Sequence, residues 1–168
     1  MRSSLIATAL VLGWCGVAGA KDPPLLGVEA FVAGGVMAGG GSGVAAVKTA
    51  PFTAGAKIDY LVMYQPKVSL WAEAFAEASL KQAGAGLGGG VRLRPGDGGL
   101  RLGAGAVALV MPYTAFGLTV TGGYCYGLKK FRLCGDLEWV ALLMGDDVPA
   151  NRVANEVRLV LGVGFDAM

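Results

Sequence analysis

The sequence predicts an all-β protein: an eight-stranded antiparallel up-and-down transmembrane β-barrel. Along most of the chain, apolar residues alternate with glycine, threonine or charged residues, and a period of two is typical of a β-strand. The composition is also unusual for a soluble domain, because 54% of the 168 residues are hydrophobic, only 15% are charged and 29 are glycine. Together these observations favour strands that cross a membrane.

Eight segments show the alternation, and each is long enough to cross a bilayer as a tilted strand, which takes about 9–11 residues. Two of them raise a helical alternative. "LWAEAFAEASLK" also reads as an amphipathic helix, and residues 102–128 carry no charge but contain Pro112 near the middle. We predict strands for both, because the neighbouring segments alternate in the same way. The predicted strands are residues 26–37, 53–64, 68–80, 85–95, 99–111, 114–127, 130–143 and 154–166.

Charged residues within one segment fall on the same side of the predicted strand, opposite the apolar side. A membrane barrel turns its apolar side to lipid and its polar side to the lumen, and eight strands leave an interior that side chains can fill. Glycines on the polar side would leave room for long charged chains. Because buried charges must be paired, we expect an ion-pair network that plugs the lumen, with an ion path or ligand site as the alternative. The expected network is Glu29, Lys57, Asp59, Glu73, Glu77, Arg92, Arg94, Arg101, Arg132, Asp136, Glu138, Glu156 and Arg158.

The first twenty residues have the pattern of a secretory signal peptide. Arg2 supplies a positive charge, "LIATALVLGWCGV" is an apolar core, and "AGA" at 18–20 is a small-residue cleavage site. We therefore expect a signal peptide at 1–20 and a barrel domain at 21–168; an uncleaved membrane anchor is the alternative.

Cleavage would leave two cysteines, Cys125 and Cys134, in a chain exported to an oxidising compartment. If the hairpin between them turns at Lys129 and Lys130, the two cysteines lie opposite each other on neighbouring strands. This spacing predicts a cross-strand disulfide, and two free buried thiols are the alternative.

Several kinds of chemistry have no support in the sequence. The chain contains no histidine, which removes histidine-dependent catalytic triads and the usual zinc and iron ligand sets. "GAGLGG" at 84–89 and "GAGAVA" at 103–108 match a dinucleotide-binding pattern but open no βαβ unit. The net charge of +2 does not indicate nucleic acid as a partner. We expect no enzymatic activity, no cofactor and no metal site.

The alternating pattern resembles the small eight-stranded outer-membrane β-barrels of Gram-negative bacteria, the OmpA/OmpX/OmpW-like group. The resemblance covers nearly all of residues 21–168. The C-terminal "VRLVLGVGF" is similar to the β-signal read by the outer-membrane assembly machinery, although three residues, "DAM", follow the aromatic that usually comes last. The resemblance implies a monomer in the bacterial outer membrane, with lipid and the assembly machinery as partners. The β-signal residues would be Leu159, Leu161, Val163 and Phe165.

In such a barrel both termini face the periplasm, so short turns at 65–67, 95–99 and 127–130 would face the same side. The outward loops would be 38–52, 81–84, 111–114 and 144–153. We expect a structural, adhesive or surface-interaction role through loops 38–52 and 144–153. The alternatives are a narrow channel, a carrier of small hydrophobic ligands, and a soluble periplasmic lipocalin-like barrel with its faces reversed. An aromatic girdle is expected near the periplasmic end, with ordinary aromatic strand propensity as the alternative: Tyr60, Tyr64, Tyr124, Tyr126, Phe131 and Phe165.

Overall fold

The computed structural model describes residues 24–39, 46–65, 67–81, 83–96, 99–111, 114–128, 131–145 and 153–167. The expected signal peptide at 1–20 lies outside the described residues, as do residues 40–45 and 146–152 of the two expected long outer loops. No helix in the described part of the chain is long and apolar enough to cross a membrane.

Eight long antiparallel strands close into a barrel, as predicted. Each strand pairs with its neighbour in the chain, and the first strand also pairs with the last, so the sheet closes on itself. The predicted strand limits hold to within two residues at every end, and the segment with helical character is a strand. The long strands are β1 (Leu26–Gly39), β3 (Thr53–Gln65), β4 (Val68–Ser79), β5 (Ala85–Pro95), β6 (Leu100–Met111), β7 (Ala115–Leu128), β8 (Phe131–Gly145) and β9 (Ala154–Ala167).

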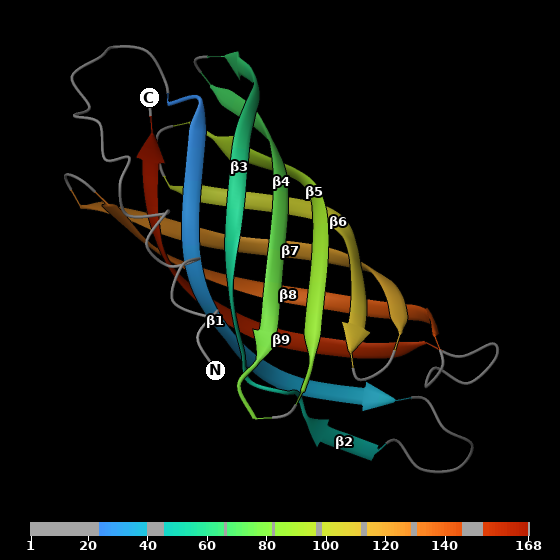
Figure 1. The fold of residues 1–168 in the computed structure, drawn as a ribbon. Coiled ribbons are helices and arrows are strands. Elements are labelled where there is room, and N and C mark those ends of the chain that lie inside the picture. Colours follow the sequence, from blue (N-terminus) through green and yellow to red (C-terminus); the bar gives the residue numbers. More distant parts are fainter. Residues whose placement is uncertain are drawn as a thin grey trace.

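The strands are strongly tilted, and β1, β3, β4 and β5 cross in front of β6–β9 in Figure 1. The pairing register fixes this tilt. When paired residues are followed once around the barrel from Glu29, the path returns to β1 at Gly39, ten residues further along. For eight strands, this stagger corresponds to a tilt of about 40°.

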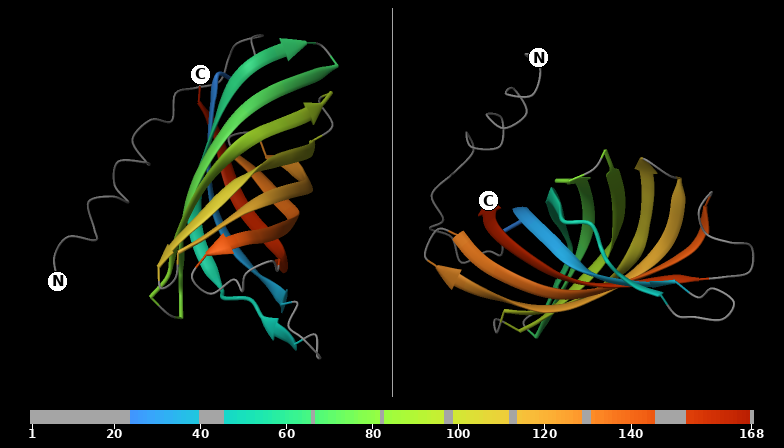
Figure 2. Two further views of the ribbon diagram at one scale, coloured as in Figure 1. Left: turned by 90° about the vertical axis from the view of Figure 1, so that its right-hand side faces the viewer. Right: turned by 90° about the horizontal axis from the view of Figure 1, so that it is seen from below.

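Part of the expected outer loop 38–52 is a strand, which corrects the prediction there. β1 continues to Gly39, and the short β2 (Ala46–Thr49) pairs with its far end, from Val36↔Thr49 to Gly39↔Ala46. The left view of Figure 2 shows β2 beside that end of β1. The Ala50 amide donates a hydrogen bond to the Gly35 carbonyl oxygen, with a nitrogen-to-oxygen distance of 2.9 Å, and so keeps the chain against β1 after β2. Valine and threonine in "AVKT" favour an extended backbone.

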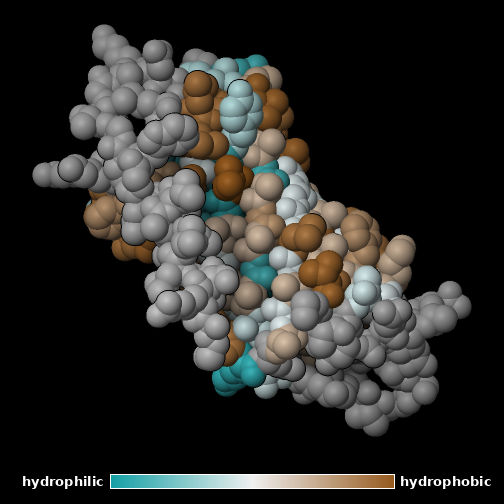
Figure 3. All heavy atoms as spheres, viewed as in Figure 1, coloured by the Kyte–Doolittle hydropathy of each residue, from teal (hydrophilic) through white to brown (hydrophobic). Residues whose placement is uncertain are grey.

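The two sides of each strand have opposite chemistry. On β9, Val157, Leu159 and Leu161 are exposed on the outside, whereas Glu156 and Arg158 are buried in the lumen. The same alternation recurs on the other long strands. On the face drawn in Figure 3, the described surface is mostly brown to white, with few teal areas. The outer surface is therefore apolar, and most of the charge lies inside.

The lumen also holds an apolar cluster that the sequence analysis missed. The expectation that the inner side carries only glycine, threonine, serine and charge is wrong for this part of the barrel. Phe31 and Phe75, on β1 and β4, are buried among aliphatic side chains of β6–β9. A closed interior must be filled, and these chains fill it between two charged regions. The cluster is Phe31, Ala33, Phe75, Val107, Ala115, Val140, Leu142 and Val160.

Candidate functional site

All thirteen residues of the expected network lie on the inner side of the barrel. Eleven are buried, and the other two, Glu73 and Arg94, are half-buried. They do not form one continuous network. The ion pairs divide twelve of them into three groups, centred on Arg101, Asp59 and Arg158, and Glu156 belongs to none.

Arg101 on β6 binds two carboxylates, Glu29 on β1, which lies across the barrel, and Asp136 on β8. Its Nε and Nη2 each lie 2.5 Å from an Asp136 oxygen, and its Nη1 and Nη2 lie 2.6 and 3.1 Å from the two Glu29 oxygens. Lys57 adds a longer ion pair, with Nζ 3.8 Å from Asp136 Oδ2, and the same Nζ lies 5.0 Å from the centre of the Phe31 ring. This group links β1, β3, β6 and β8 across the lumen.

Asp59 on β3 is shared by three arginines. Its Oδ2 lies 2.5 Å from Arg94 Nη2, 3.4 Å from Arg132 Nη2 and 3.5 Å from Arg92 Nη1. Arg92 also pairs with Glu73. The residues of this Asp59 group all lie in the half of the barrel that holds the start of β1 and the end of β9.

Asp166 is a member of this group that the sequence analysis missed, and it forms an ion pair with Arg132. It lies on β9 at the same parity as Glu156 and Arg158, so the alternation itself could have identified it. The residues after Phe165 thus continue β9 as far as Ala167, paired with the start of β1.

Arg158 on β9 organises the third group, beyond the apolar cluster. Its Nε lies 2.6 Å from Glu138 Oε2, and its Nη1 lies 2.8 and 3.0 Å from the two Glu77 oxygens. The Thr53 hydroxyl donates a further hydrogen bond to Glu77, with an oxygen-to-oxygen distance of 3.0 Å. Glu156 is buried but has no ion pair or hydrogen bond with another described residue.

Glycines leave the space that the charged side chains occupy. A Cβ atom on Gly162 would collide with the carboxylate of Glu29, and one on Gly123 would collide with Asp136. A Cβ atom on Gly164 would lie 2.7 Å from Arg132 Nε, closer than any normal contact. These positions therefore require glycine because long inner side chains lie directly over the backbone of neighbouring strands.

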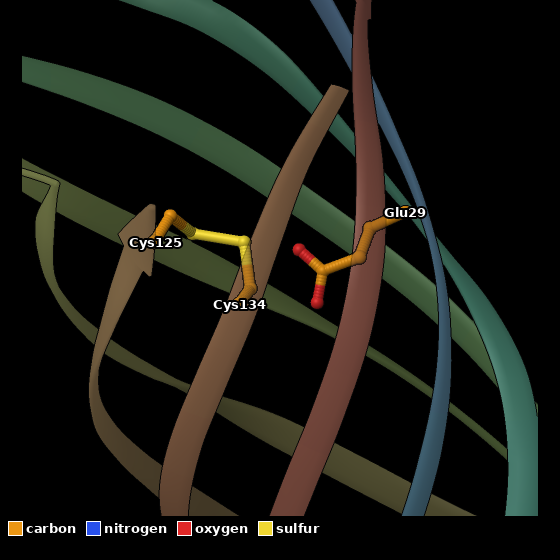
Figure 4. A group of neighbouring side chains, drawn as sticks. All are labelled: Glu29, Cys125 and Cys134. Carbon is orange, nitrogen blue, oxygen red and sulfur yellow. A yellow bond between two sulfur atoms is a disulfide. The ribbon is translucent and has the colours of Figure 1, made fainter. Parts of the chain in front are cut away.

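Cys125 and Cys134 form the expected disulfide. They are direct partners in the β7–β8 register, and their sulfur atoms are bonded. Glu29 is close enough that its carboxylate and the two sulfur atoms lie within 4.8 Å of one another, and Figure 4 shows the carboxylate directed toward the sulfurs. Such a group could hold a metal only with free thiolates. Here the sulfurs are bonded to each other and Glu29 binds Arg101, so these donors are already used.

A cavity of about 310 Å³ opens at the end of the barrel where β1 begins and β9 ends. We call this end the terminal mouth. Arg94, Arg132, Asp166 and Trp71 line the cavity, together with Arg101 at its base. The Arg94 guanidinium lies over the Trp71 ring, 4.1 Å from its centre, and the Trp71 Nε1 donates to Ser69 Oγ at 2.8 Å.

Five of the six aromatic residues expected to form a girdle are exposed on the outside near the terminal mouth. The expectation is wrong for Tyr64, because the register shift between Leu61 and Met63 pairs it with the inward Ser69, and it lines the cavity. The Phe131 and Phe165 rings lie 6.3 Å apart, centre to centre. The other outward residues of the expected β-signal, Leu159, Leu161 and Val163, are exposed along β9.

No family model and no curated protein matches the sequence. Among solved structures, the chain is similar to Neisserial surface protein A (NspA), with 12% identity, a TM-score of 0.54, and coverage of 87% of this chain and 99% of that chain. Ail, the attachment invasion locus protein of Yersinia pestis, has 12% identity, a TM-score of 0.46, and coverage of 86% and 100%. The predicted fold class is thus confirmed: the chain has the fold of the small eight-stranded transmembrane β-barrels of the outer membrane.

Proposed function

We propose that this chain is a non-enzymatic, monomeric protein of the bacterial outer membrane that acts through the loops at the end opposite the terminal mouth. The observation that carries the proposal is the sidedness of the strands. Large apolar side chains cover the outside of the barrel, and charged side chains fill the inside. Exposing such a continuous apolar surface to water is unfavourable for a monomer, whereas contact with lipid is favourable.

The sidedness also disfavours the soluble alternative. A lipocalin-like barrel would turn its apolar side chains inward around a ligand and its charges toward water. Here buried arginines and carboxylates occupy that interior.

A closed lumen is supported by two charged groups with an apolar cluster between them. Arg101 spans the interior from β6 to Glu29 on β1 and also binds Asp136, and Arg158 spans it from Glu77 to Glu138. Both arginines are buried, and the intervening cluster contains two phenylalanine rings. An ion would have to displace these pairs to pass, so we propose a plug rather than a conducting path.

In such a protein, the outer loops are the part that can contact molecules outside the cell. The barrel wall would face lipid and the lumen would be filled, so segments 38–52, which includes β2, and 144–153 would carry a structural, adhesive or surface-interaction role. β1 and β2 continue past the last residue pair between β1 and β3. They would therefore hold the first outer segment further from the membrane surface. The β-signal residues of β9 would be read by the assembly machinery on the way to the outer membrane.

Gel migration before and after heating, combined with cell fractionation, tests this location. We expect the protein in the outer-membrane fraction, extracted only by detergent, and a shift in apparent size after boiling, because a lipid-adapted barrel remains folded in detergent until heated. Recovery in the soluble periplasm without detergent would contradict the proposal. Reconstitution into planar bilayers tests the plug, since a filled lumen predicts no steady conductance, and discrete reproducible conductance steps would contradict it.

A further inference from the structure

The terminal mouth has unused hydrogen-bond donors on cationic side chains. Arg94 and Arg132 both line the cavity and both contact a single oxygen of Asp59. The Nε atoms of both arginines have no hydrogen-bond partner among the described residues, and Arg132 is buried. A buried guanidinium N–H without a partner costs free energy. These Nε atoms are closed to solvent, so an anion in the cavity would bind the outer guanidinium nitrogens of the two arginines instead.

Asp59, Glu73 and Asp166 equal Arg92, Arg94 and Arg132 in number, but the three carboxylates are shared unevenly among the arginines. Arg92 has Glu73 as a second partner and Arg132 has Asp166, but Arg94 has only its share of Asp59. Asp166 is the only one of the three carboxylates that lines the cavity, and 38% of its side chain is exposed. It therefore occupies the open side of Arg132, where an anion entering from outside would have to bind.

We propose that the terminal mouth is a binding site for a small oxyanion, a phosphate or a carboxylate, held between Arg94 and Arg132. Guanidinium groups recognise both anions through paired N–H donors. Trp71 supports the site by holding the Arg94 guanidinium against its ring, and the cavity of about 310 Å³ has room for a small solute. Asp166 acts as a tethered competitor for Arg132. The inference goes beyond the surface role proposed above and does not depend on it.

Trp71 gives a direct readout, because its ring contacts Arg94 while Trp139 lies on the outside of the barrel. In a background in which Trp14 and Trp139 are both replaced by phenylalanine, the purified protein in neutral detergent is titrated with inorganic phosphate at constant ionic strength and followed by tryptophan emission. Acetate is titrated in a parallel series. A response to phosphate alone assigns the site to phosphate, and a response to both assigns it to oxyanions in general.

Three variants make the test specific. Asp166→Asn removes the competitor and should tighten binding about tenfold, the magnitude of one charge-assisted hydrogen bond. Arg94→Gln should weaken binding at least tenfold. Lys67→Gln removes the same unit of charge from an exposed residue near the mouth that does not line the cavity, and it should leave binding unchanged.

The proposal is overturned if neither the parent protein nor Asp166→Asn shows a saturable response to phosphate or acetate. It is equally overturned if Arg94→Gln and Lys67→Gln weaken the response to the same degree, because the effect would then be one of general surface charge. Heat-modifiable migration of each variant establishes that the barrel is folded. Because Asp166→Asn is expected to gain affinity, the test does not depend on a variant that only loses it.

Discussion

Replacing Arg101 with glutamine should destabilise the barrel by about 3–5 kcal/mol, which is the usual cost of removing one partner of a buried ion pair. Arg101 makes four short contacts with Glu29 and Asp136, and both carboxylates are about 1% exposed. Lys57 remains 3.8 Å from Asp136 after the change, so Glu29 is the carboxylate left without a cation. The cost should therefore come mainly from one uncompensated charge.

The assay is urea-induced unfolding of the protein in phospholipid vesicles, followed by tryptophan emission. A double variant, Arg101→Gln with Glu29→Gln, should recover most of the lost stability, because it removes the uncompensated charge. Lys67→Gln is the matched control and should change the free energy of unfolding by less than about 0.5 kcal/mol, since Lys67 is exposed. A loss below about 1 kcal/mol for Arg101→Gln, or a double variant no more stable than the single one, would show that Glu29 does not depend on Arg101 for its charge balance.

Three further predictions concern the packing of the lumen, the disulfide and the outer face. Gly162→Ala should destabilise the barrel by about 1–3 kcal/mol, because the added Cβ would displace Glu29. Gly135→Ala is the neutral control in the same unfolding assay, because the atom nearest to its added Cβ lies at 3.7 Å. The cysteines of the β7–β8 disulfide should resist alkylation in denaturant until a reductant is added, and reduction should cost at most about 3 kcal/mol; immediate alkylation would show free thiols. Leu137→Arg, at an outward position in mid-strand, should cost about 2–4 kcal/mol in vesicles, and Leu80→Arg, just beyond the end of β4, about 0–1 kcal/mol. Equal costs at the two depths would contradict a lipid-facing surface.

Much of the fold could be predicted from the sequence, because alternate residues of a membrane-barrel strand face two different environments, lipid and lumen. Lipid requires apolar residues on one side of a strand. The alternation from Val157 to Phe165 therefore identified the lipid-facing side without a structure. The β7–β8 cysteines could be paired because both lie at equal distance from a short turn. β2 was missed because its four residues are too few for a periodic pattern to emerge.

The ion-pair partners within the lumen could not be predicted from the sequence in the same way. Parity identifies which residues face inward, but the partner of an inward charge depends on the stagger of the strands. Arg158 reaches Glu77 across the barrel, 81 positions away, because of this stagger. The inward phenylalanines Phe31 and Phe75 were missed for a related reason: they fill volume that only the closed barrel defines.

The apolar outer side of the barrel should contact lipid, and the charged inner side should not. Two tryptophans test it directly, because Trp139 lies outside on β8, 45% exposed, and Trp71 lies inside on β4, 3% exposed. Single-tryptophan variants, with every other tryptophan replaced by phenylalanine, are reconstituted in vesicles of lipids brominated along their acyl chains. Bromine quenches tryptophan only at short range. We expect strong quenching of Trp139 and little quenching of Trp71; strong quenching of Trp71 with Trp139 unaffected would contradict a lipid-facing outer side.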